Sequence, residues 1–525
     1  MDTAPNDLRS TPPRASTVDD DALPTFTHQQ IVSVLTGILL CILLAAIDQT
    51  VVVPAVPAIA ADLNGFGHLS WIVSAYLLTS TAATPIYGKL SDIYGRRAML
   101  LPAIVLFVIA SALCAVSQTL FQLIVFRALQ GLGGAGLMSM AQAAIADVVA
   151  PRERGRYQGY MAGTWGVASI AGPILGGYVT DNLSWHWIFW INVPIGAAAF
   201  VLSNRALKLL KVRPRATRID YLGASLLTGF ITSCLVVMSW GGVEYPWLSA
   251  PVLGLSGLAV ALVAALVVQE RRAVDPLLPP RLFVNSVFTR GVIIAMLSAA
   301  GMFGATFLLP LFFQLVRGAD ASTSGSLVVP FLGFNVVGAY MSGQMSRKLG
   351  KAKVIVLGGL SLAVLGFVLL AFMGAGTPLV FDIVAMIVVG IGIGICMPSS
   401  LVIVQNAAER RDVGSATGAL LFLRSMGAAF GSTLVGALLA SQFASGLAKR
   451  GVTEIIDLSA LRGHEGTTLS LSPATMAMAQ DALVGGFHLA FAVCAGLSVV
   501  ALIVCAGMRD LPLQSAAPAP APAGH

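Results

Sequence analysis

Long apolar runs, joined by short polar or Gly/Pro-rich connections, are the sequence feature that most constrains how this chain can fold. One helical crossing of a bilayer needs about 20 mostly apolar residues. A soluble fold cannot bury this chain, because 57% of its 525 residues are hydrophobic and 10% are charged, against roughly 25% charged in an ordinary soluble domain. We therefore predict an all-α polytopic membrane protein. Fourteen candidate spans fall near residues 31–53, 70–88, 98–117, 120–145, 157–180, 188–206, 221–240, 250–268, 288–315, 324–343, 353–373, 379–403, 414–440 and 486–507.

The same composition excludes several classes of function. Low charge argues against a nucleic-acid partner, which needs a broad basic face. All six cysteines fall inside apolar runs, which indicates small buried side chains and neither disulfides nor a metal site. The glycines at 131–136 lie within an apolar helix and not after a strand, and the sequence has no phosphate-binding Gly-Lys-Ser/Thr motif. We expect neither an enzyme nor a bound metal or cofactor.

The positions of Lys and Arg predict how the chain lies in the membrane. If the N-terminus is inside, 25 of the 31 basic residues fall in cytoplasmic segments, four fall outside and two lie within spans. Cytoplasmic loops of membrane proteins carry an excess of Lys and Arg. Both termini are therefore predicted to be cytoplasmic, and the connection 441–485 is predicted to be an outside loop.

An internal repeat predicts the architecture. The stretch Gly88-Lys-Leu-Ser-Asp-Ile-Tyr-Gly95-Arg96 follows the second span, and Gly343-Gln-Met-Ser-Arg-Lys-Leu-Gly350-Lys351 follows the tenth. Two six-helix halves would place the copies six spans apart, so a separation of eight indicates two inserted helices. Parallel repeats of this kind enclose a central cavity near the middle of the membrane. The predicted units are a cytoplasmic tail (1–30), an N-terminal six-helix bundle (31–210), two inserted central helices (219–270), a C-terminal six-helix bundle (286–507) and a cytoplasmic Ala/Pro tail (508–525).

Several motifs, in a fixed order, are similar to those of a known transporter family. They are Asp48-Gln49-Thr50, the stretch Gly88 to Arg97, Arg127-Ala-Leu-Gln130-Gly-Leu-Gly-Gly-Ala-Gly136, Gly172-Pro173-Ile-Leu-Gly176-Gly177, and Trp185-His-Trp-Ile-Phe189. From about residue 31 to 510 the chain resembles the fourteen-span drug:proton antiporter family of the major facilitator superfamily, of the multidrug efflux type.

The resemblance implies a function and a location. It implies export of hydrophobic or amphipathic drugs and toxic compounds across a bacterial cytoplasmic membrane, by alternating access and in exchange for protons. Antibiotic resistance would follow. The implied partners are the lipid bilayer, a small substrate, protons and, in a Gram-negative cell, a periplasmic adaptor. Two rival functions stay open, namely a dedicated exporter of one metabolite such as a siderophore or sugar, and a membrane receptor without transport.

The loop after the second span combines glycines with charges. Its glycines allow a tight turn, and Asp92 lies among basic residues. A charge cluster where two halves meet can stabilise one arrangement of the halves and open in another. The alternative is a purely topogenic role. The second copy carries Arg347 at the position of Asp92, so we expect an asymmetric latch. The resemblance assigns the conformational switch to Gly88, Asp92, Gly95, Arg96 and Arg97.

The fifth span carries a small-residue motif. Its glycines lie at near-helical spacing and would let a neighbouring helix approach closely, while its proline removes one backbone hydrogen bond and permits a kink. From the residues alone we predict packing. The resemblance assigns the motif, formed by Gly172, Pro173, Gly176 and Gly177, to antiport.

Ionisable side chains inside spans are the sharpest candidates for proton coupling, and these are Asp48, Arg127 and Arg424. Such a group costs roughly 3 kcal/mol near the centre of a bilayer. Asp48 and Arg127 are predicted at similar depths, so they can pair, with Asp48 as the proton carrier or, alternatively, with both as a fixed structural ion pair. Arg424 lies near mid-depth without an acidic partner in its own half. It faces the cavity, balances a carboxylate of the other half, binds an anionic group, or rests against backbone carbonyls.

Polar and aromatic side chains on inward-facing helices are candidates for substrate contact. We assign Gln49, Gln130 and Trp165 to the substrate cavity. Asp382, near the outer end of the twelfth span, is predicted to be interfacial.

Overall fold

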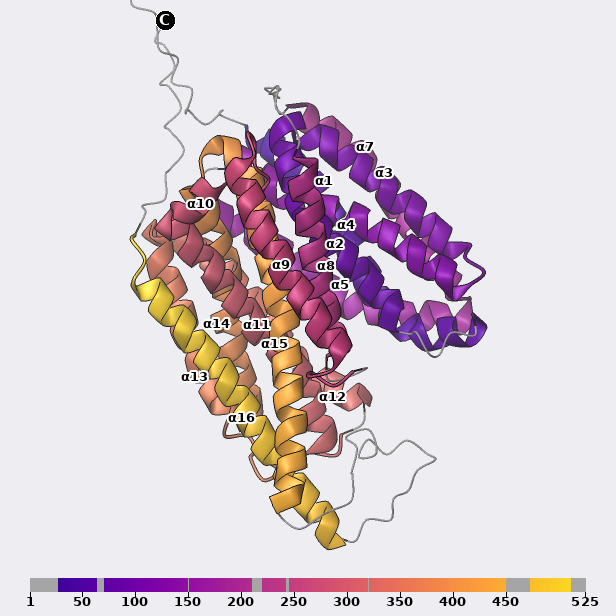
Figure 1. The fold of residues 1–525 in the computed structure, drawn as a ribbon, viewed down its shortest axis with the longest axis vertical. Helices are drawn as coiled ribbons and strands as arrows, with labels where there is room; N and C mark the ends of the chain where they lie inside the picture. Colours follow the sequence, from indigo (N-terminus) through magenta and orange to yellow (C-terminus); the bar gives the residue numbers. More distant parts are fainter. Residues whose placement is uncertain are drawn as a thin grey trace, which may run out of the picture.

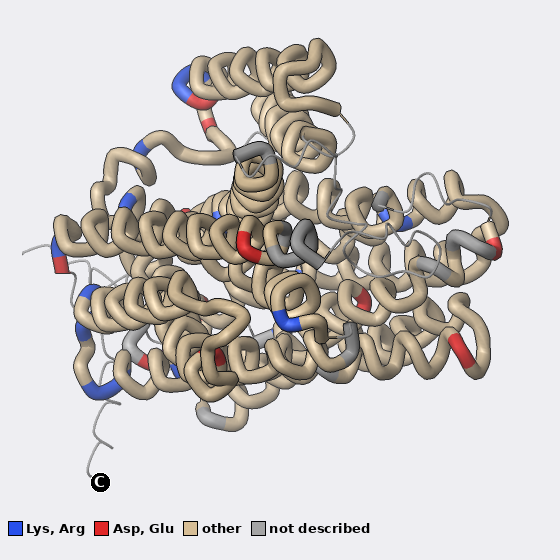
Figure 2. Tube along the Cα trace, turned by 90° about the horizontal axis from the view of Figure 1, so that it is seen from below, with Lys and Arg blue, Asp and Glu red and all other residues tan. Residues whose placement is uncertain are grey.

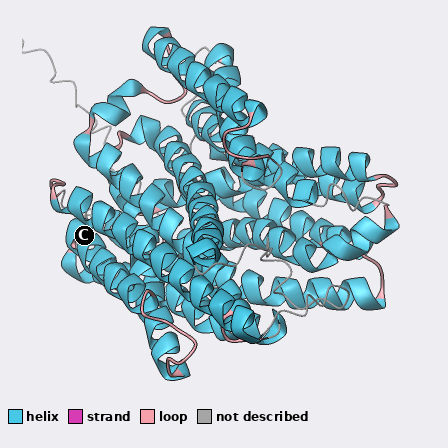
Figure 3. Cartoon of the chain, turned by 60° about the horizontal axis from the view of Figure 1, so that its bottom comes forward, coloured by secondary structure: helices cyan, strands magenta, loops and turns pink. Residues whose placement is uncertain are grey.

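The computed structural model describes residues 27–63, 70–149, 151–209, 220–241, 245–319, 321–449 and 473–510, and it shows helices joined by short turns. Figure 3 shows no strand in this part of the chain, where the β-type contact is an isolated bridge between Gly241 and Tyr245. The prediction of an all-α protein is confirmed. The predictions for the outermost parts of both tails and for residues 450–472 lie outside the described residues.

Two sets of long helices flank a helical pair. The N-terminal half consists of α1 (His28–Asp62), α2 (Ser70–Tyr94), α3 (Arg96–Ala115), α4 (Leu120–Val148), α5 (Pro151–Asn182), α6 (His186–Trp190) and α7 (Asn192–Ala206). The helical pair is α8 (Tyr221–Trp240) and α9 (Ala250–Arg272), followed by the short α10 (Pro280–Val284). The C-terminal half consists of α11 (Ser286–Leu315), α12 (Ala321–Leu349), α13 (Ala352–Leu370), α14 (Leu379–Ala407), α15 (Val413–Lys449) and α16 (Pro473–Ala506).

Within the described residues, 12 helical segments are long and apolar enough to cross a membrane. The two other predicted spans correspond to α2 and α5, whose 25 and 32 residues exceed the roughly 20 needed for a crossing. Both helices pack against the opposite half, α2 on α15 and α5 on α12. A helix in this position faces protein on more sides than lipid, so it carries more small and polar residues. For these two helices, membrane crossing stays a prediction.

The pair α8 and α9 lies over the boundary between the halves, as Figure 1 shows. Leu227 and Ile231 of α8 and Leu266 of α9 form an apolar cluster with Ala82 of α2 and Phe422 of α15. The rest of α9 faces outward, since 17% of its most apolar window is buried inside the protein. The pair therefore packs on the two helices that join the halves and presents its other side to lipid.

Both copies of the sequence repeat end in the same turn. Gly95 has a φ of 89° and Gly350 has a φ of 63°, in the left-handed region that favours glycine. The N–H of Gly95 donates to the carbonyl of Ser91 at 2.9 Å, and the N–H of Gly350 donates to the carbonyl of Ser346 at 3.0 Å. The sequence repeat is thus a structural repeat at the ends of α2 and α12.

The halves contact each other at one end of the bundle. We call it the basic end because it holds the two repeat turns, 88–97 and 343–351, and their Lys and Arg residues; Figure 2 shows many Lys and Arg on this side, at the left. A Cβ atom added to Gly88 would lie 2.5 Å from the carbonyl oxygen of Gly414, and one added to Gly343 would lie 2.4 Å from that of Gly155. Only glycine permits backbones to approach this closely.

Toward the opposite end the same helices separate. The face of α5 that contacts α12 through Gly155 and Gly159 continues by helical spacing to Gly177, where an added Cβ would meet nothing within 4 Å. The matching face of α12 continues to Gly333, which is equally open, and to Val329, which is 45% exposed. Figure 1 shows the halves diverging toward the bottom of the view. The protein is closed at the basic end and open at the opposite end.

Several predicted boundaries fall short of the helices. The first span was predicted to end at 53, whereas α1 continues to Asp62. The outside loop was predicted over 441–485, whereas α15 reaches Lys449 and α16 begins at Pro473. In α15 and α16 an apolar run marks the part of the helix that lies in lipid, and the helix continues beyond it where Ala, Leu, Met and Gln favour helical backbone. In α1 the helix continues through Pro54 and Pro57.

Candidate functional site

Asp48 lies at the centre of a hydrogen-bonded cluster inside the N-terminal half. Its Oδ2 accepts a hydrogen bond from Nη1 of Arg127 on α4 at 2.7 Å. Its Oδ1 accepts from Nε2 of Gln130 at 2.7 Å and from Nδ2 of Asn192 at 2.8 Å. Each of the four side chains is at most 1% exposed. The structure thus brings together the two residues that the sequence suggested could pair, and it adds two amides.

The guanidinium of Arg127 is held from several sides. Nη1 also donates to Oε1 of Gln130 at 2.8 Å, and Nε donates to the carbonyl oxygen of Ile72 on α2 at 3.2 Å. Its carbon lies 4.5 Å from the ring centre of Tyr76 and 5.8 Å from that of Phe189, within the range of cation–π attraction. A buried charge is tolerated where such partners compensate for the water it has lost.

Local structure explains why these groups converge. Arg127 and Gln130 are three residues apart on α4 and so share a face. The helical segment after Trp185 breaks before Pro194, whose nitrogen cannot donate to the preceding turn, and Asn192 begins the new helix at that break. Asn192 also donates to Oγ of Ser111 at 3.0 Å. Sequence reasoning missed Asn192 and Ser111; an amide two residues before a proline in an apolar run was the available signal.

The cluster has two possible chemical uses. Removing one partner of a buried ion pair costs about 3–5 kcal/mol, so the pair can act as a fixed structural element. Asp48 is sealed in this conformation, with 0% exposure, so a proton can reach its carboxylate only if the cluster opens. The same geometry therefore serves a structural ion pair or a proton carrier whose loading is tied to a conformational change.

The small-residue motif of α5 packs against α1 beside this cluster. A Cβ atom added to Gly172 would lie 1.9 Å from Oγ1 of Thr50, and one added to Gly176 would lie 2.3 Å from the carbonyl oxygen of Val51. Thr50 donates to the carbonyl oxygen of Ala168 on α5 at 3.0 Å. Pro173 is exposed, and Gly177 has open space around it. Half of the motif therefore joins α5 to α1, and half faces the opening between the halves.

Asp92 joins the two halves at the basic end. Its carboxylate accepts hydrogen bonds from the backbone N–H groups of Gly414 at 2.9 Å and Ser415 at 2.7 Å, in the first turn of α15. The hydroxyl of Ser415 also donates to it at 3.1 Å. First-turn N–H groups have no partner within their own helix and favour a negative charge. Asp92 of one half is therefore the cap of a helix in the other half.

The two arginines that follow have different partners. Nη1 of Arg96 donates to Asp92 at 2.7 Å, and its Nε donates to Asp147 at the end of α4 at 2.8 Å. Arg97 instead donates to Oδ1 of Asn204 on α7, at 2.6 Å and 3.1 Å. Of the five predicted switch residues, Gly88, Asp92 and Arg96 gather at the interface, Gly95 forms the turn that follows, and Arg97 stays within the N-terminal half.

A segment that sequence reasoning did not single out crosses the same interface. We call residues 273–284, which comprise the linker after α9 and α10, the strap. Asp275 in the strap forms an ion pair with Lys89, next to the Gly88 contact. Arg281 in the strap pairs with Asp412 at 2.9 Å, directly before α15 begins. The helical pair α8–α9 is thus followed by a segment bonded to both halves beside the Asp92 cap.

The second copy of the repeat makes a different contact. It packs on α5 through Gly343 and Gly155, and it presents Arg347 where the first copy presents Asp92. The first turn of α5 carries its own carboxylate, Glu153, and begins with proline. A carboxylate from the other half is therefore not needed there. Both interfaces have a Gly–Gly contact, Gly88 with Gly414 and Gly343 with Gly155, and the first adds the Asp92 cap across the halves.

Arg424 is on α15, where it is partly exposed and makes no hydrogen bond or ion pair with any residue in the part of the chain that the structure describes. Asp382, the carboxylate predicted near the outer end of the twelfth span, is bonded to Arg317 and to Oγ1 of Thr377, the latter at 2.9 Å. A coupling role for Arg424 stays a prediction, and no proton-carrying group lies beside it among the described residues.

The three predicted cavity residues differ in position. Gln130 is fully buried and bonded within the Asp48 cluster, so this conformation does not present it to open space. Gln49 and Trp165 are half-buried, and Trp165 packs against two apolar clusters of the N-terminal half. Their contact with a substrate stays a prediction.

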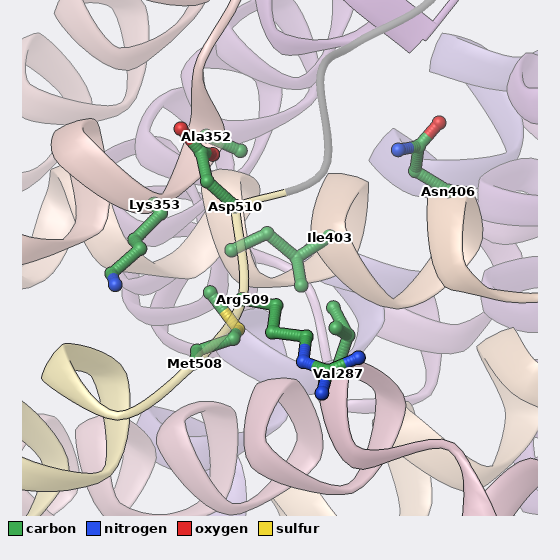
Figure 4. Close-up of a pocket in the computed structure, with 8 residues that line it drawn as sticks. All are labelled: Val287, Ala352, Lys353, Ile403, Asn406, Met508, Arg509 and Asp510. Atoms are coloured by element: carbon green, nitrogen blue, oxygen red, sulfur yellow. The ribbon is translucent and has the colours of Figure 1, made fainter.

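A hollow at the basic end is drawn in Figure 4, between Val287, Ile403 and the residues that follow α16. Its cavity volume is about 10 Å³. That is room for about one water molecule. This hollow is therefore too small to hold a substrate.

Comparison with known sequences agrees with this architecture. The family description "Major Facilitator Superfamily" matches residues 38–432. An uncharacterized MFS-type transporter of Mycobacterium tuberculosis is 39% identical over 406 residues, which cover 77% of this chain and 59% of that protein. The multidrug transporter MdtP of Bacillus subtilis is 35% identical, with 77% of this chain and 74% of that protein covered. Multidrug resistance protein 3 of the same species is 35% identical, with 79% and 80% covered.

Solved structures share the fold. The human organic anion transporter MFSD10 aligns with a TM-score of 0.61 over 90% of this chain and 99% of its own, at 15% identity. The proton:xylose symporter XylE aligns with a TM-score of 0.55 over 91% and 95%, at 13% identity. At such low identity these likenesses concern the fold alone.

Proposed function

This chain belongs to the major facilitator superfamily, so it is a membrane transporter and not an enzyme, and we propose that it exports hydrophobic or amphipathic compounds in exchange for protons. The observation that carries the proposal is the sealed Asp48–Arg127 pair, in a protein whose halves are closed at one end and open at the other. Relatives named multidrug transporter and multidrug resistance protein support the substrate class.

Alternating access requires a second arrangement of the halves. We place the basic end in the cytoplasm, with both termini, because Lys and Arg are concentrated there. The conformation described here then faces outward. To face inward, Asp92 must release the N–H groups of Gly414 and Ser415, and the open faces of α5 and α12 must come together. The cap, the strap and the Gly–Gly contacts stabilise the outward-facing state.

Proton coupling follows from the chemistry of the cluster. A proton that neutralises Asp48 removes the negative charge that holds Arg127 and leaves the donors of Gln130 and Asn192 without an ionised acceptor. The cluster must then rearrange, which moves α1 against α4. Because α5 is packed on α1 through Gly172 and Gly176, that movement reaches the helix that contacts the opposite half. Release of the proton on the inner side would restore the pair. The energy source would be the proton gradient of a bacterial cytoplasmic membrane.

The test uses everted membrane vesicles, in which export appears as uptake. Three fluorescent amphiphiles cover the possible charges: ethidium as a cation, dansyl-aminoundecanoic acid as an anion and its amide as a neutral compound. We expect uptake of at least one when a pH gradient is imposed, loss of that uptake when the pH gradient is collapsed, and no gradient-driven uptake in Asp48→Asn or Arg127→Ala. Uptake that survives collapse of the pH gradient, or that persists in Asp48→Asn, would contradict the proposal.

A further inference from the structure

Arg424 is a charge without a partner at a depth where charges are costly. It is the twelfth residue of α15 (Val413–Lys449). At 1.5 Å per residue it lies about 16 Å along the helix from the basic end, near the middle of a hydrocarbon layer of about 30 Å. An ionisable side chain at this depth normally pairs with another group or serves a function. Within the described residues its guanidinium has neither a hydrogen bond nor an ion pair.

The carboxylates that could neutralise Arg424 are already engaged. Asp48, the deepest carboxylate of the described spans, is bonded to Arg127 at 2.7 Å. Asp382, in the first turn of α14, is bonded to Arg317. The remaining carboxylates of the long helices lie in or near their first and last turns, apart from Asp481, the exposed ninth residue of α16. The charge of Arg424 is therefore uncompensated within the part of the protein that the structure describes.

Arg424 shares its face of α15 with residues that point into the protein. Leu420, four residues before it, is 0% exposed. Thr417, seven residues before it, accepts a hydrogen bond at 3.1 Å from Gln405 of α14. Gln405 also donates to the carbonyl oxygen of Gln142 on α4 at 3.3 Å and so crosses from one half to the other. The face of Arg424 thus points toward the boundary between the halves.

Other residues on the same face of α15 pack against protein, which indicates that Arg424 does not face lipid. Gly427 and Gly431, three and seven residues further along, pack on the backbone carbonyls of Met296 and Ala300 of α11. Leu420 below is buried, yet Arg424 keeps partial exposure. From these neighbours on its helix face, we reason that the exposed part of Arg424 is directed toward the interior, beyond the Gln405 contact between the halves. A charged group that faces open interior space is placed to meet a ligand.

We propose that Arg424 binds the anionic head group of the transported compound, and that the substrates of this transporter include amphipathic carboxylates. The guanidinium offers several N–H donors in a plane that matches a carboxylate. The apolar body of the compound would lie between the halves, which are open on that side. The transport consequence rests on the export function proposed above, whereas binding of the carboxylate does not.

The test is equilibrium binding to the purified full-length protein in lipid nanodiscs, with empty nanodiscs as the partitioning control. The probes are dansyl-aminoundecanoic acid and its amide, which differ in charge and share the apolar body. In Arg424→Gln we expect at least tenfold weaker binding of the acid and less than twofold change for the amide. Arg424→Lys should lie between wild type and Arg424→Gln. Arg272→Gln, which removes an exposed arginine at the end of α9, is the matched control and should bind like wild type.

Thermal unfolding without a probe separates binding from folding. Removing a charge that lacks a partner should leave the Tm of Arg424→Gln equal to wild type or higher, and only wild type should gain stability from the acid. The proposal is overturned by an unchanged affinity of Arg424→Gln for the acid, by equal losses for acid and amide, by no binding of the acid to wild type, or by a marked fall in Tm. Binding of the acid without uptake in everted vesicles would contradict the export function but would still support the binding site at Arg424.

Discussion

At the scale of single residues, the proposed proton coupling depends on how the carboxylate of Asp48 is held. Its two oxygens accept hydrogen bonds from Arg127, Gln130 and Asn192, which come from two different helices. Loss of its charge therefore disturbs α1, α4 and α7 together. An ion pair with a single partner would connect only two helices.

The contribution of Asn192 gives a first prediction. Asn192→Ala leaves Asp48 with one buried donor fewer and Ser111 without a partner from α7, so we expect about 1–3 kcal/mol lower stability. Thermal unfolding of the purified protein measures this. Asn182→Ala is the control, because its amide donates to the carbonyl of Tyr178 in an exposed turn. Equal Tm values for the two variants would mean that the hydrogen bond from Asn192 to Asp48 does not contribute to the stability of the protein.

Part of this site was predictable from the residues. Asp48 and Arg127 were identifiable because an ionisable side chain in an apolar run is exceptional. Asn192 and Ser111 were not, because neutral polar residues occur throughout such helices and their partners are set by tertiary packing. Gln130 was assigned to the cavity, yet its amide bonds Asp48 in a sealed cluster. The spacing along a helix gives the face of a side chain but not which neighbour lies there.

At the scale of elements, adjacent glycines in α5 allow a matched comparison. A side chain at Gly176 would meet the backbone of α1, whereas one at Gly177 would meet open space. We expect Gly176→Ala to lower the Tm and to abolish uptake in everted vesicles. In the conformation described here, Gly177→Ala should keep the Tm of wild type or gain up to about 1 kcal/mol of helix stability. Similar behaviour of the two variants would contradict the packing of α5 on α1 described here.

The cap of α15 gives a prediction for the interface between halves. Replacing Asp92 with alanine removes acceptors from the N–H groups of Gly414 and Ser415, at a cost of about 0.5–2 kcal/mol. We expect faster amide hydrogen exchange in the first turn of α15 and unchanged exchange in the first turn of α5, which supplies its own Glu153. Equal protection of the α15 amides in wild type and Asp92→Ala would show that the cap is absent in solution.

The strap gives a second prediction at this scale. Lys89→Asp and Asp275→Lys each place like charges together next to the Gly88 contact, so each should raise exchange in the first turn of α15. The double variant restores opposite charges and should return exchange and uptake toward wild type. Additive damage in the double variant would mean that the two residues do not interact.

At the scale of the whole molecule, the architecture was more predictable from the sequence than the contacts between residues were. The repeat at Gly88 and Gly343 indicated two related halves, and the turns at Gly95 and Gly350 have the same backbone conformation. The asymmetry expected from Arg347 corresponds to two chemically different interfaces. The strap was not predicted, because the sequence around Asp275 does not show that the fold will place this residue beside Lys89. Helix ends were predicted short because hydropathy marks lipid contact and not the hydrogen-bonded helix.

The proposed role of Asp48, as carrier of the proton exchanged for substrate, can be tested by following the protons themselves. Purified protein is reconstituted in liposomes that contain a pH-sensitive dye, an outward substrate gradient is imposed, and internal pH is recorded beside substrate efflux. We predict that wild type acidifies the lumen as substrate leaves. Asp48→Asn should still exchange labelled for unlabelled substrate but should move no protons. Substrate-driven acidification in Asp48→Asn equal to that of wild type would contradict this role of Asp48.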